Sequence, residues 1–295
     1  MIGYKEYLKK ENYRTTTIDS YTNEVKKFNS WCKRNHTTPE QIDYKTCMKY
    51  IKHLQRKNTN KKTVNHKLGI IKSYLNYLIA VALRPDNPIE TTTIKGIKRT
   101  VNYNILESDE LEDLYYSYQS DNVADKYHRL CAKRNKVIVG LLVYQGLNTT
   151  ELIQLELEDL QLYKGKVYIK SGARSNSRTL ELKPWQVIEF LEYIKEVREE
   201  IIDRKQLQTD RIFIPSNKRL GNTIQFILKK LKKINHKVNS SNQIRASVIT
   251  NWLKQYNLRE VQVMAGHRYI SSTERYVQND LESLHEIVNN FHPIQ

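Results

Sequence analysis

The sequence predicts a mainly helical chain of two domains, the first all-helical and the second an α+β domain with a small antiparallel sheet. Three observations predict this fold. Apolar residues recur at helical spacing over most of the chain, two prolines interrupt the pattern near residue 86, and two short segments alternate between apolar and polar residues as strands do. At 295 residues with 39% hydrophobic content, the chain is long enough to form two hydrophobic cores.

Residues 1–85 predict a domain of four short helices. The first lies near the N-terminus, the second begins near Thr15, the third follows Pro39, and the fourth runs from about Thr63 to Leu83. In each helix, apolar residues fall three or four positions apart and form one face, which packs against its neighbours. These faces comprise Tyr4, Tyr7 and Leu8; Ile18, Tyr21, Val25, Phe28 and Trp31; Met48, Ile51 and Leu54; and Val64, Leu68, Ile71, Tyr74, Leu75 and Leu78.

The run from Arg84 to Pro88 ends this region, because prolines on both sides of Asp86 and Asn87 interrupt a helix. The residues that follow are rich in Thr and Lys and have no apolar period. We therefore predict a linker over residues 86–104 and a second domain over residues 105–295.

The second domain combines helices with one β-hairpin. Gly165–Lys170 and Arg178–Leu182 alternate like strands, and the residues between them have the composition of a turn. Ser108 is a suitable N-cap for the first helix, and Glu151 suits the positive end of a helix that begins near Thr149. The other predicted elements are an apolar helix over 137–144, a helix from Pro184 to about Asp203, an extended segment over 212–215, and helices from Thr223 to the C-terminus.

The charge balance indicates a polyanionic partner. Lys and Arg number 49 against 32 Asp and Glu, which gives a net charge of +17 and a pI near 9.5. The excess is uneven, since residues 51–100 contain eleven Lys or Arg and only two acidic residues. We predict that this segment contacts the phosphates of a nucleic acid, with Lys57, Lys61, Lys62 and Lys67 as candidate contacts. A merely basic soluble protein is the alternative.

Cysteine usage and apolar runs exclude several classes of protein. Cys32, Cys47 and Cys131 are far apart and include no CxxC pair, so we expect neither a disulfide framework nor a metal site, and a reducing cytosol fits. The N-terminus lacks the apolar segment of a signal peptide. No run of 18 apolar residues occurs, so no transmembrane helix is expected. These features favour a cytoplasmic, nucleoid-associated protein.

The most specific pattern lies near the C-terminus. Gly266 and His267 are followed by Thr273 and then by Tyr276, nine residues after the histidine. This segment resembles the C-terminal box of the tyrosine recombinases, the phage integrase family (Xer-like), in which the tyrosine is the nucleophile. Several matched features at fixed spacing rarely arise by chance, so Tyr276 is the candidate nucleophile.

Two further segments resemble the arginine motifs of that family. Asn242-Gln-Ile-Arg245 precedes an apolar helix and is similar to the family's His-x-x-Arg motif, with Asn242 in place of the histidine. The segment Tyr144–Leu152 is similar to the Thr-Gly-Leu-Arg-x-x-Glu-Leu motif, with Asn148 in place of the arginine. The resemblance therefore retains the second active-site arginine and lacks the first.

The predicted hairpin corresponds to the place where the family carries a catalytic lysine. Alignment on Arg178 puts Ala173 at the lysine's position. Lys170 and Arg174 are the nearest cations and the candidates to substitute for it. Arg178 itself is a candidate DNA contact.

The resemblance implies a core-binding (SAM-like) domain, a catalytic domain and DNA strand transfer without a cofactor. Tyr276 would attack the scissile phosphate and leave a 3′-phosphotyrosine and a free 5′-hydroxyl. Arg245 would bind the non-bridging oxygens, and His267 would hydrogen-bond the phosphate or the tyrosine. Asn148 and Asn242 can donate hydrogen bonds but carry no charge.

Several functions fit these residues. One is a recombinase or integrase of a mobile genetic element, and another is a catalytically impaired relative that binds DNA as an accessory or architectural factor. A DNA-binding regulator outside the family is a third, remote alternative. The resemblance also implies double-stranded DNA as the partner, bound by a homotetramer or by an assembly with an active recombinase. The apolar stripe within Leu281–Phe291 would then pack on its own domain or on a neighbouring subunit.

Overall fold

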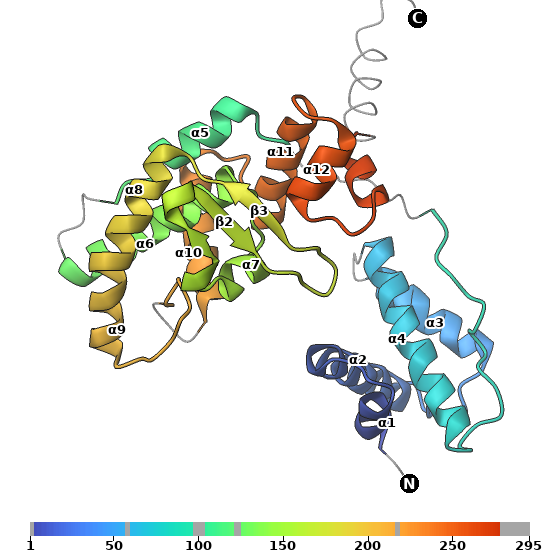
Figure 1. The fold of residues 1–295 in the computed structure, drawn as a ribbon. Coiled ribbons are helices and arrows are strands. Elements are labelled where there is room, and N and C mark those ends of the chain that lie inside the picture. The colour runs from blue at the N-terminus through green and yellow to red at the C-terminus, as the bar shows by residue number, and fades with distance from the viewer. Residues whose placement is uncertain (1–2, 57–59, 97–103, 121–124, 216–218, 278–295) are drawn as a thin grey trace, which may run out of the picture. The chain divides into compact units, whose positions relative to one another are not determined.

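The computed structural model describes residues 3–56, 60–96, 104–120, 125–215 and 219–277. The chain divides into two compact units, Met1–Lys98 and Arg99–Gln295, each with its own core (Figure 1). The predicted fold class is confirmed, since helices dominate both units and the second contains one small antiparallel sheet. Lys57 and the stripe within Leu281–Phe291 lie outside the described residues.

Four helices form the first unit, as predicted. The second and fourth have 20 residues each and pack against each other. Side chains from three of the helices, including Leu8, Phe28, Leu68 and Leu75, are fully buried in the core. The helices are α1 (Tyr4–Lys10), α2 (Thr15–Arg34), α3 (Tyr44–Arg56) and α4 (Lys61–Ala80).

The end of the first unit is fixed by Arg84, a buried residue in a segment that sequence patterns identify only as a break. Its Nη1 donates to the Pro39 carbonyl at 2.7 Å, and its Nη2 donates to the Ile42 carbonyl at 3.2 Å. Ile89 is buried in the same core. The first residues of the predicted linker therefore pack on this unit, because Arg84 ties them to the loop between α2 and α3.

α6 lies at the centre of the second unit. Every side chain over residues 137–143 is buried, which explains the continuous apolar run in the sequence, and α5, α8 and α11 pack around it. No helix in the described part of the chain is long and apolar enough to cross a membrane. The helices are α5 (Ser108–Tyr116), α6 (Lys126–Val143), α7 (Thr149–Gln154), α8 (Pro184–Glu192), α9 (Glu199–Lys205), α10 (Leu220–Ile234), α11 (Ser241–Leu253) and α12 (Leu258–Ala265), with 3₁₀ turns at Leu157–Asp159 and Leu162–Lys164 and a π-helix at Tyr193–Arg198.

Several helix boundaries differ from the predicted ones, and the starts of α5 and α6 show why. The N-cap of α5 is Glu107 and not Ser108, and the Glu107 backbone N–H donates to the Glu110 carboxylate at 3.0 Å in a capping box. α6 begins at Lys126, well before the predicted apolar run, and Asp125 is its N-cap. Its first turns are largely polar, so they lie outside the apolar run that predicted the helix.

The sheet has three antiparallel strands in the order β1 (Leu160–Gln161), β2 (Lys166–Ile169) and β3 (Arg178–Glu181). The predicted hairpin is confirmed, with Val167 opposite Leu180 and both buried in the core. β1 escaped prediction because two residues are too few to show alternation. The loop that joins β2 to β3 reaches the segment after α12, where Ser175 pairs with His267 (Figure 1).

Candidate active site

Tyr276 lies on the helical turns at residues 271–277 and is half-buried. Its ring stacks on the ring of His267, with centroids 5.9 Å apart and planes 9° apart. It also packs against the small apolar cluster of Ile249, Val261 and Ala265. The candidate nucleophile and the candidate histidine are therefore held side by side within the C-terminal segment.

The His267 ring is oriented by Thr273, which is fully buried. His267 Nδ1 lies 2.8 Å from Thr273 Oγ1. Burial, with the positive charges of Arg245 and Arg178, lowers the pKa of His267 to about 4, so the ring is neutral near pH 7. A neutral imidazole carries one N–H, and when the Thr273 hydroxyl donates to Nδ1 that hydrogen is on Nε2. In this tautomer His267 is a hydrogen-bond donor.

Arg245 is fixed at the floor of the site by three acceptors. From α11, its Nη1 donates to the Gly146 carbonyl at 2.7 Å and to Glu151 Oε2 at 3.2 Å, and its Nη2 donates to the Ala265 carbonyl at 2.5 Å. Ala265 ends α12, two residues before His267. The guanidinium therefore joins the turn before α7, α7 itself and the C-terminal box. Such a preorganised charge suits a non-bridging phosphate oxygen.

Arg178 lies inside the protein, next to this cluster. Its Nη1 donates to Glu151 Oε1 at 2.9 Å, and its side chain is 1% exposed. Its guanidinium also packs on Gly266, where an added Cβ would lie 2.6 Å from Nη1. With only 1% of its side chain exposed, Arg178 does not lie at the surface, where the predicted direct contact with DNA requires it.

Asn148 and Asn242, the two asparagines at the motif positions, lie in different environments. Asn148 is the N-cap of α7, and its Oδ1 accepts from the Thr150 and Glu151 N–H groups at 2.9 and 3.0 Å. Asn242 is exposed on the first turn of α11, and no hydrogen bond joins its side chain to another described residue. Asn148 thus has a structural role that an arginine would not fill.

The two candidates for the hairpin lysine have different environments. Hydrogen bonds from its ammonium to Glu156 and Glu158 raise the pKa of Lys170, and Asp159 lies 3.6 Å away. These carboxylates hold Lys170 at the base of the hairpin loop and make it a weaker acid. Arg174 is exposed in the loop, and no ion pair joins it to another residue of the described ranges. Arg174 therefore retains the freedom to reach a bound ligand.

In the first unit, the predicted DNA contacts lie on α4. Lys61 and Lys62 are exposed at its first turn. Lys67 is partly covered and forms an ion pair with Glu24 at 3.5 Å. Lys61 and Lys62 therefore remain available to a polyanion, whereas part of the Lys67 charge is neutralised.

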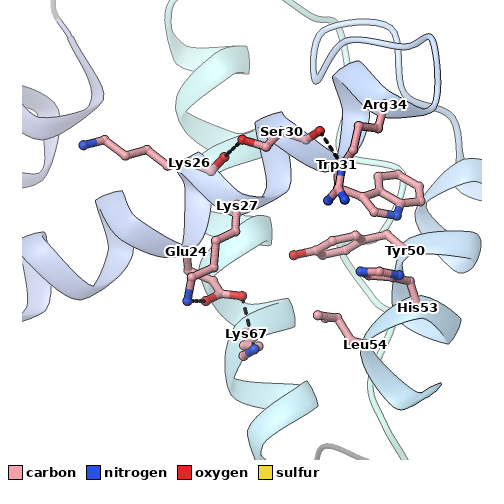
Figure 2. Close-up of a pocket in the computed structure, with 10 residues that line it drawn as sticks. All are labelled: Glu24, Lys26, Lys27, Ser30, Trp31, Arg34, Tyr50, His53, Leu54 and Lys67. Carbon is pink, nitrogen blue, oxygen red and sulfur yellow. Dashed lines mark hydrogen bonds and ion pairs between the residues drawn. The ribbon is translucent and has the colours of Figure 1, made fainter. Parts of the chain in front are cut away.

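The sequence-based prediction missed a group of cations on α2. Lys26, Lys27 and Arg34 line a hollow of about 290 Å³ together with Lys67 on α4, and Figure 2 shows Glu24 at its side, bridged to both Lys27 and Lys67. Lys27 and Arg34 are seven residues apart, so they share one face of the helix. That spacing is the signal that could have identified them.

This fold and this group of residues define a member of the phage integrase family. The family model described as "Phage integrase family" matches residues 104–283, and "Phage integrase, N-terminal SAM-like domain" matches residues 1–81. Together they span most of the chain, so the chain belongs to this family.

Relatives and solved structures agree with this assignment. The chain is 25% identical to TnP I resolvase of Bacillus thuringiensis (92% of this chain and 93% of that protein) and 26% identical to tyrosine recombinase XerD of Staphylococcus saprophyticus (98% of each). Its fold is similar to that of XerH site-specific recombinase bound to difH, with a TM-score of 0.65 at 20% identity (94% of this chain, 80% of that chain). It is also similar to a λ integrase dimer bound to a COC′ core site, with a TM-score of 0.63 at 14% identity (94% and 75%).

Proposed function

We propose that this chain is a tyrosine recombinase that cuts and rejoins DNA at a specific site, in the service of a mobile genetic element. The observation that carries the proposal is the convergence of Arg245, His267 and Tyr276. Arg245 binds the Ala265 carbonyl just before the histidine, and the histidine stacks on the tyrosine. Relatives that are named recombinases or resolvases align with more than nine-tenths of the chain, which supports the same function.

The proposed reaction exchanges one phosphodiester for another. The Tyr276 oxygen forms a bond to phosphorus, the bond to the 5′-oxygen breaks, and the phenolic proton lost by the tyrosine is balanced by a proton gained by the 5′-oxygen. Two groups would stabilise the added charge: the Arg245 guanidinium and the Nε2–H of neutral His267. The bond energy is retained in the phosphotyrosine, so neither ATP nor a cofactor is needed.

The weak points of the site motivate the alternative function, an accessory DNA-binding protein without cleavage. Asn148 supplies no charge, and Lys170 is held by carboxylates. Arg174 can stabilise charge on the leaving 5′-oxygen but cannot donate a proton near neutral pH. Loss of one preorganised donor lowers a rate by roughly 10²–10³, so we expect slow cleavage by this chain.

The test is the formation of a covalent adduct on a suicide substrate. The target sequence is first obtained by selection from a randomised duplex library, and a nick is then placed beside the scissile phosphate so that cleavage becomes irreversible. We expect an SDS-resistant protein–DNA adduct that Tyr276→Phe abolishes.

Tyr269→Phe is the matched control, because Tyr269 is an exposed tyrosine in the same segment. Its adduct yield should equal that of the wild type. A wild-type protein that binds the selected site and forms no adduct over hours would instead establish the accessory function.

We further propose that the hollow on α2 and α4 contacts the DNA backbone. Arg34→Ala should weaken binding and reduce the slope of log Kd against log salt by about 1, as expected when one phosphate contact is lost. Lys10→Ala, at the end of α1, should leave that slope unchanged. An unchanged slope for Arg34→Ala would place the DNA on another face.

Assembly on DNA follows from the same proposal. A solved λ integrase structure is a tetramer bound to a Holliday junction. We propose a homotetramer of this chain on two duplexes, or an assembly with an active recombinase, acting on nucleoid DNA in the cytoplasm. Mass measurement on a synthetic four-way junction should give four copies, and a single copy at saturation would contradict the homotetramer.

A further inference from the structure

One carboxylate in the site serves two arginines. Glu151 Oε1 accepts from Arg178 Nη1 at 2.9 Å, and Oε2 accepts from Arg245 Nη1 at 3.2 Å and from the Asn148 N–H at 3.0 Å. Burial raises the pKa of Glu151, but the hydrogen bond from Arg178 and the charges of both arginines outweigh it and lower the pKa overall. Glu151 is therefore ionised, and the cluster contains two positive charges and one negative charge.

The two arginines are not equivalent. The Arg245 side chain is 12% exposed, whereas that of Arg178 is 1% exposed. Only Arg245 can meet a phosphate without a change of structure. If Glu151 were paired with Arg245 alone, the carboxylate would cancel the charge that the phosphate needs. Because Arg178 takes one oxygen of the carboxylate, a net charge of +1 remains in the cluster.

Arg178 also joins the hairpin to the C-terminal box. Gly266 lies so close that an added Cβ would be 2.6 Å from Arg178 Nη1 and 3.1 Å from its Cδ. The Asn176 N–H donates to the Gly266 carbonyl at 2.9 Å, and Ser175 pairs with His267. The guanidinium is therefore at the junction of β3, α7 and the loop that carries the histidine, where a change in its charge affects all three.

We propose that Arg178 is a positioning residue that pairs with Glu151 and offsets its negative charge, so that the cluster around Arg245 stays net positive. It thereby takes over part of the electrostatic role of the arginine that Asn148 replaces. This proposal rests on the proposed strand-transfer function, because it assigns Arg245 to the scissile phosphate. Arg178 does not touch the DNA, and its effect is on the charge that the phosphate meets.

The test compares a charged and a neutral scissile group. Arg178→Met removes the charge and keeps a long side chain. Arg178→Lys keeps the charge but lacks the paired N–H groups of a guanidinium. Lys164→Met is the control, which removes an exposed cation at the other end of the hairpin. Each variant is given the nicked substrate with a normal phosphate or with a methylphosphonate, which lacks one negative charge. Adduct formation is followed in a single turnover, and DNA affinity is measured in parallel.

We expect Arg178→Met to slow adduct formation about 100-fold on the phosphate and less than 10-fold on the methylphosphonate, because the neutral group has less need of charge. Arg178→Lys should recover a part of the rate, and Lys164→Met should match the wild type on both substrates. An equal loss on both substrates would show that Arg178 is only structural and would overturn the proposal. A wild-type rate for Arg178→Met would do the same.

A second measurement needs no cleavage and separates this proposal from the proposed function. In a Tyr276→Phe background, replacing the scissile phosphate with methylphosphonate should weaken binding several-fold when Arg178 is present. In Arg178→Met or Arg178→Lys variants that retain the wild-type circular dichroism, that penalty should vanish for Met and persist for Lys. A penalty that is the same in all three proteins would contradict the charge role, whatever the wild-type protein does to DNA.

Discussion

Replacing Gly266 with Ala tests whether the close contact between the C-terminal box and Arg178 holds the site together. Gly266 has φ +67°, and an L residue in that region costs roughly 1–2 kcal/mol. The new Cβ would also lie 2.6 Å from Arg178 Nη1 and 3.0 Å from the Asn176 carbonyl oxygen. Arg178 must then move away from Glu151, and a hydrogen bond between charged groups contributes about 1.5–3 kcal/mol. We expect a total loss of about 2.5–5 kcal/mol in the free energy of unfolding.

Gly165→Ala is the matched control. Gly165 has φ +61°, but the nearest atom to its added Cβ is the Leu182 carbonyl oxygen at 3.9 Å, which is an ordinary contact. This variant should therefore lose only the conformational term of roughly 1–2 kcal/mol. The difference between the two variants, about 1.5–3 kcal/mol, isolates the displacement of Arg178.

The assay is urea unfolding followed by tryptophan fluorescence in a Trp31→Phe background. Trp185 and Trp252 then report on the second unit alone, which lets its transition be fitted separately. Equal losses for Gly266→Ala and Gly165→Ala would refute the reasoning, because they would show that the hairpin and the box separate without strain.

Three further predictions concern charge and protons in the site. Asn148→Arg should raise the rate of adduct formation at least 10-fold in single-turnover assays. The lost N-cap should lower the free energy of unfolding by about 0.5–2 kcal/mol. An unchanged rate would mean that the phosphate does not lie near α7. A substrate with sulfur in place of the leaving 5′-oxygen should react at least 10-fold faster, because a thiolate leaves without a proton. Neither Lys170, which is held by carboxylates, nor the guanidinium of Arg174 is suited to give that proton. Equal rates would show that another group supplies it. The pKa of His267 in the folded protein, about 4, lies below the value near 6.5 of an unfolded chain, so the unfolded state binds the proton first as pH falls. Urea unfolding should therefore show stability falling from about pH 6.5 to pH 4, and His267→Gln should flatten that part of the profile.

The parts of the site that are local in sequence could be predicted from it. The Gly-His pair, Thr273 and Tyr276 lie within eleven residues, and the structure stacks His267 on Tyr276 and bonds it to Thr273. The hairpin was equally accessible, because alternation over four residues on each strand defines which side chains enter the core. Short-range patterns carry this information because the residues concerned share one element.

Pairings between distant segments could not be predicted in this way. Glu151 meets an arginine 27 positions later in the chain and another 94 positions later, and nothing in a single sequence links those positions. Arg178 looked like a surface cation, since arginines are mostly exposed. The same limitation applies to Arg84, which lies in a proline-rich break of the sequence pattern and is buried against carbonyls 42 and 45 residues earlier.

The resemblance places Asn148 where the family has its first arginine, and this network is consistent with an asparagine there. α7 has only six residues, and Asn148 satisfies two of its first N–H groups while its own N–H binds Glu151. A helix this short depends on its cap, so Asn148 fixes the carboxylate on which both arginines converge. An arginine at this position would add charge at the surface and weaken that anchor. The chain instead keeps its second charge inside, on Arg178, where Gly266 leaves room for it. Catalysis would then depend on the partly accessible Arg245 guanidinium, beside which Arg178 offsets the negative charge of Glu151. We therefore expect the double variant Asn148→Arg with Arg178→Met to form the adduct faster than Arg178→Met alone.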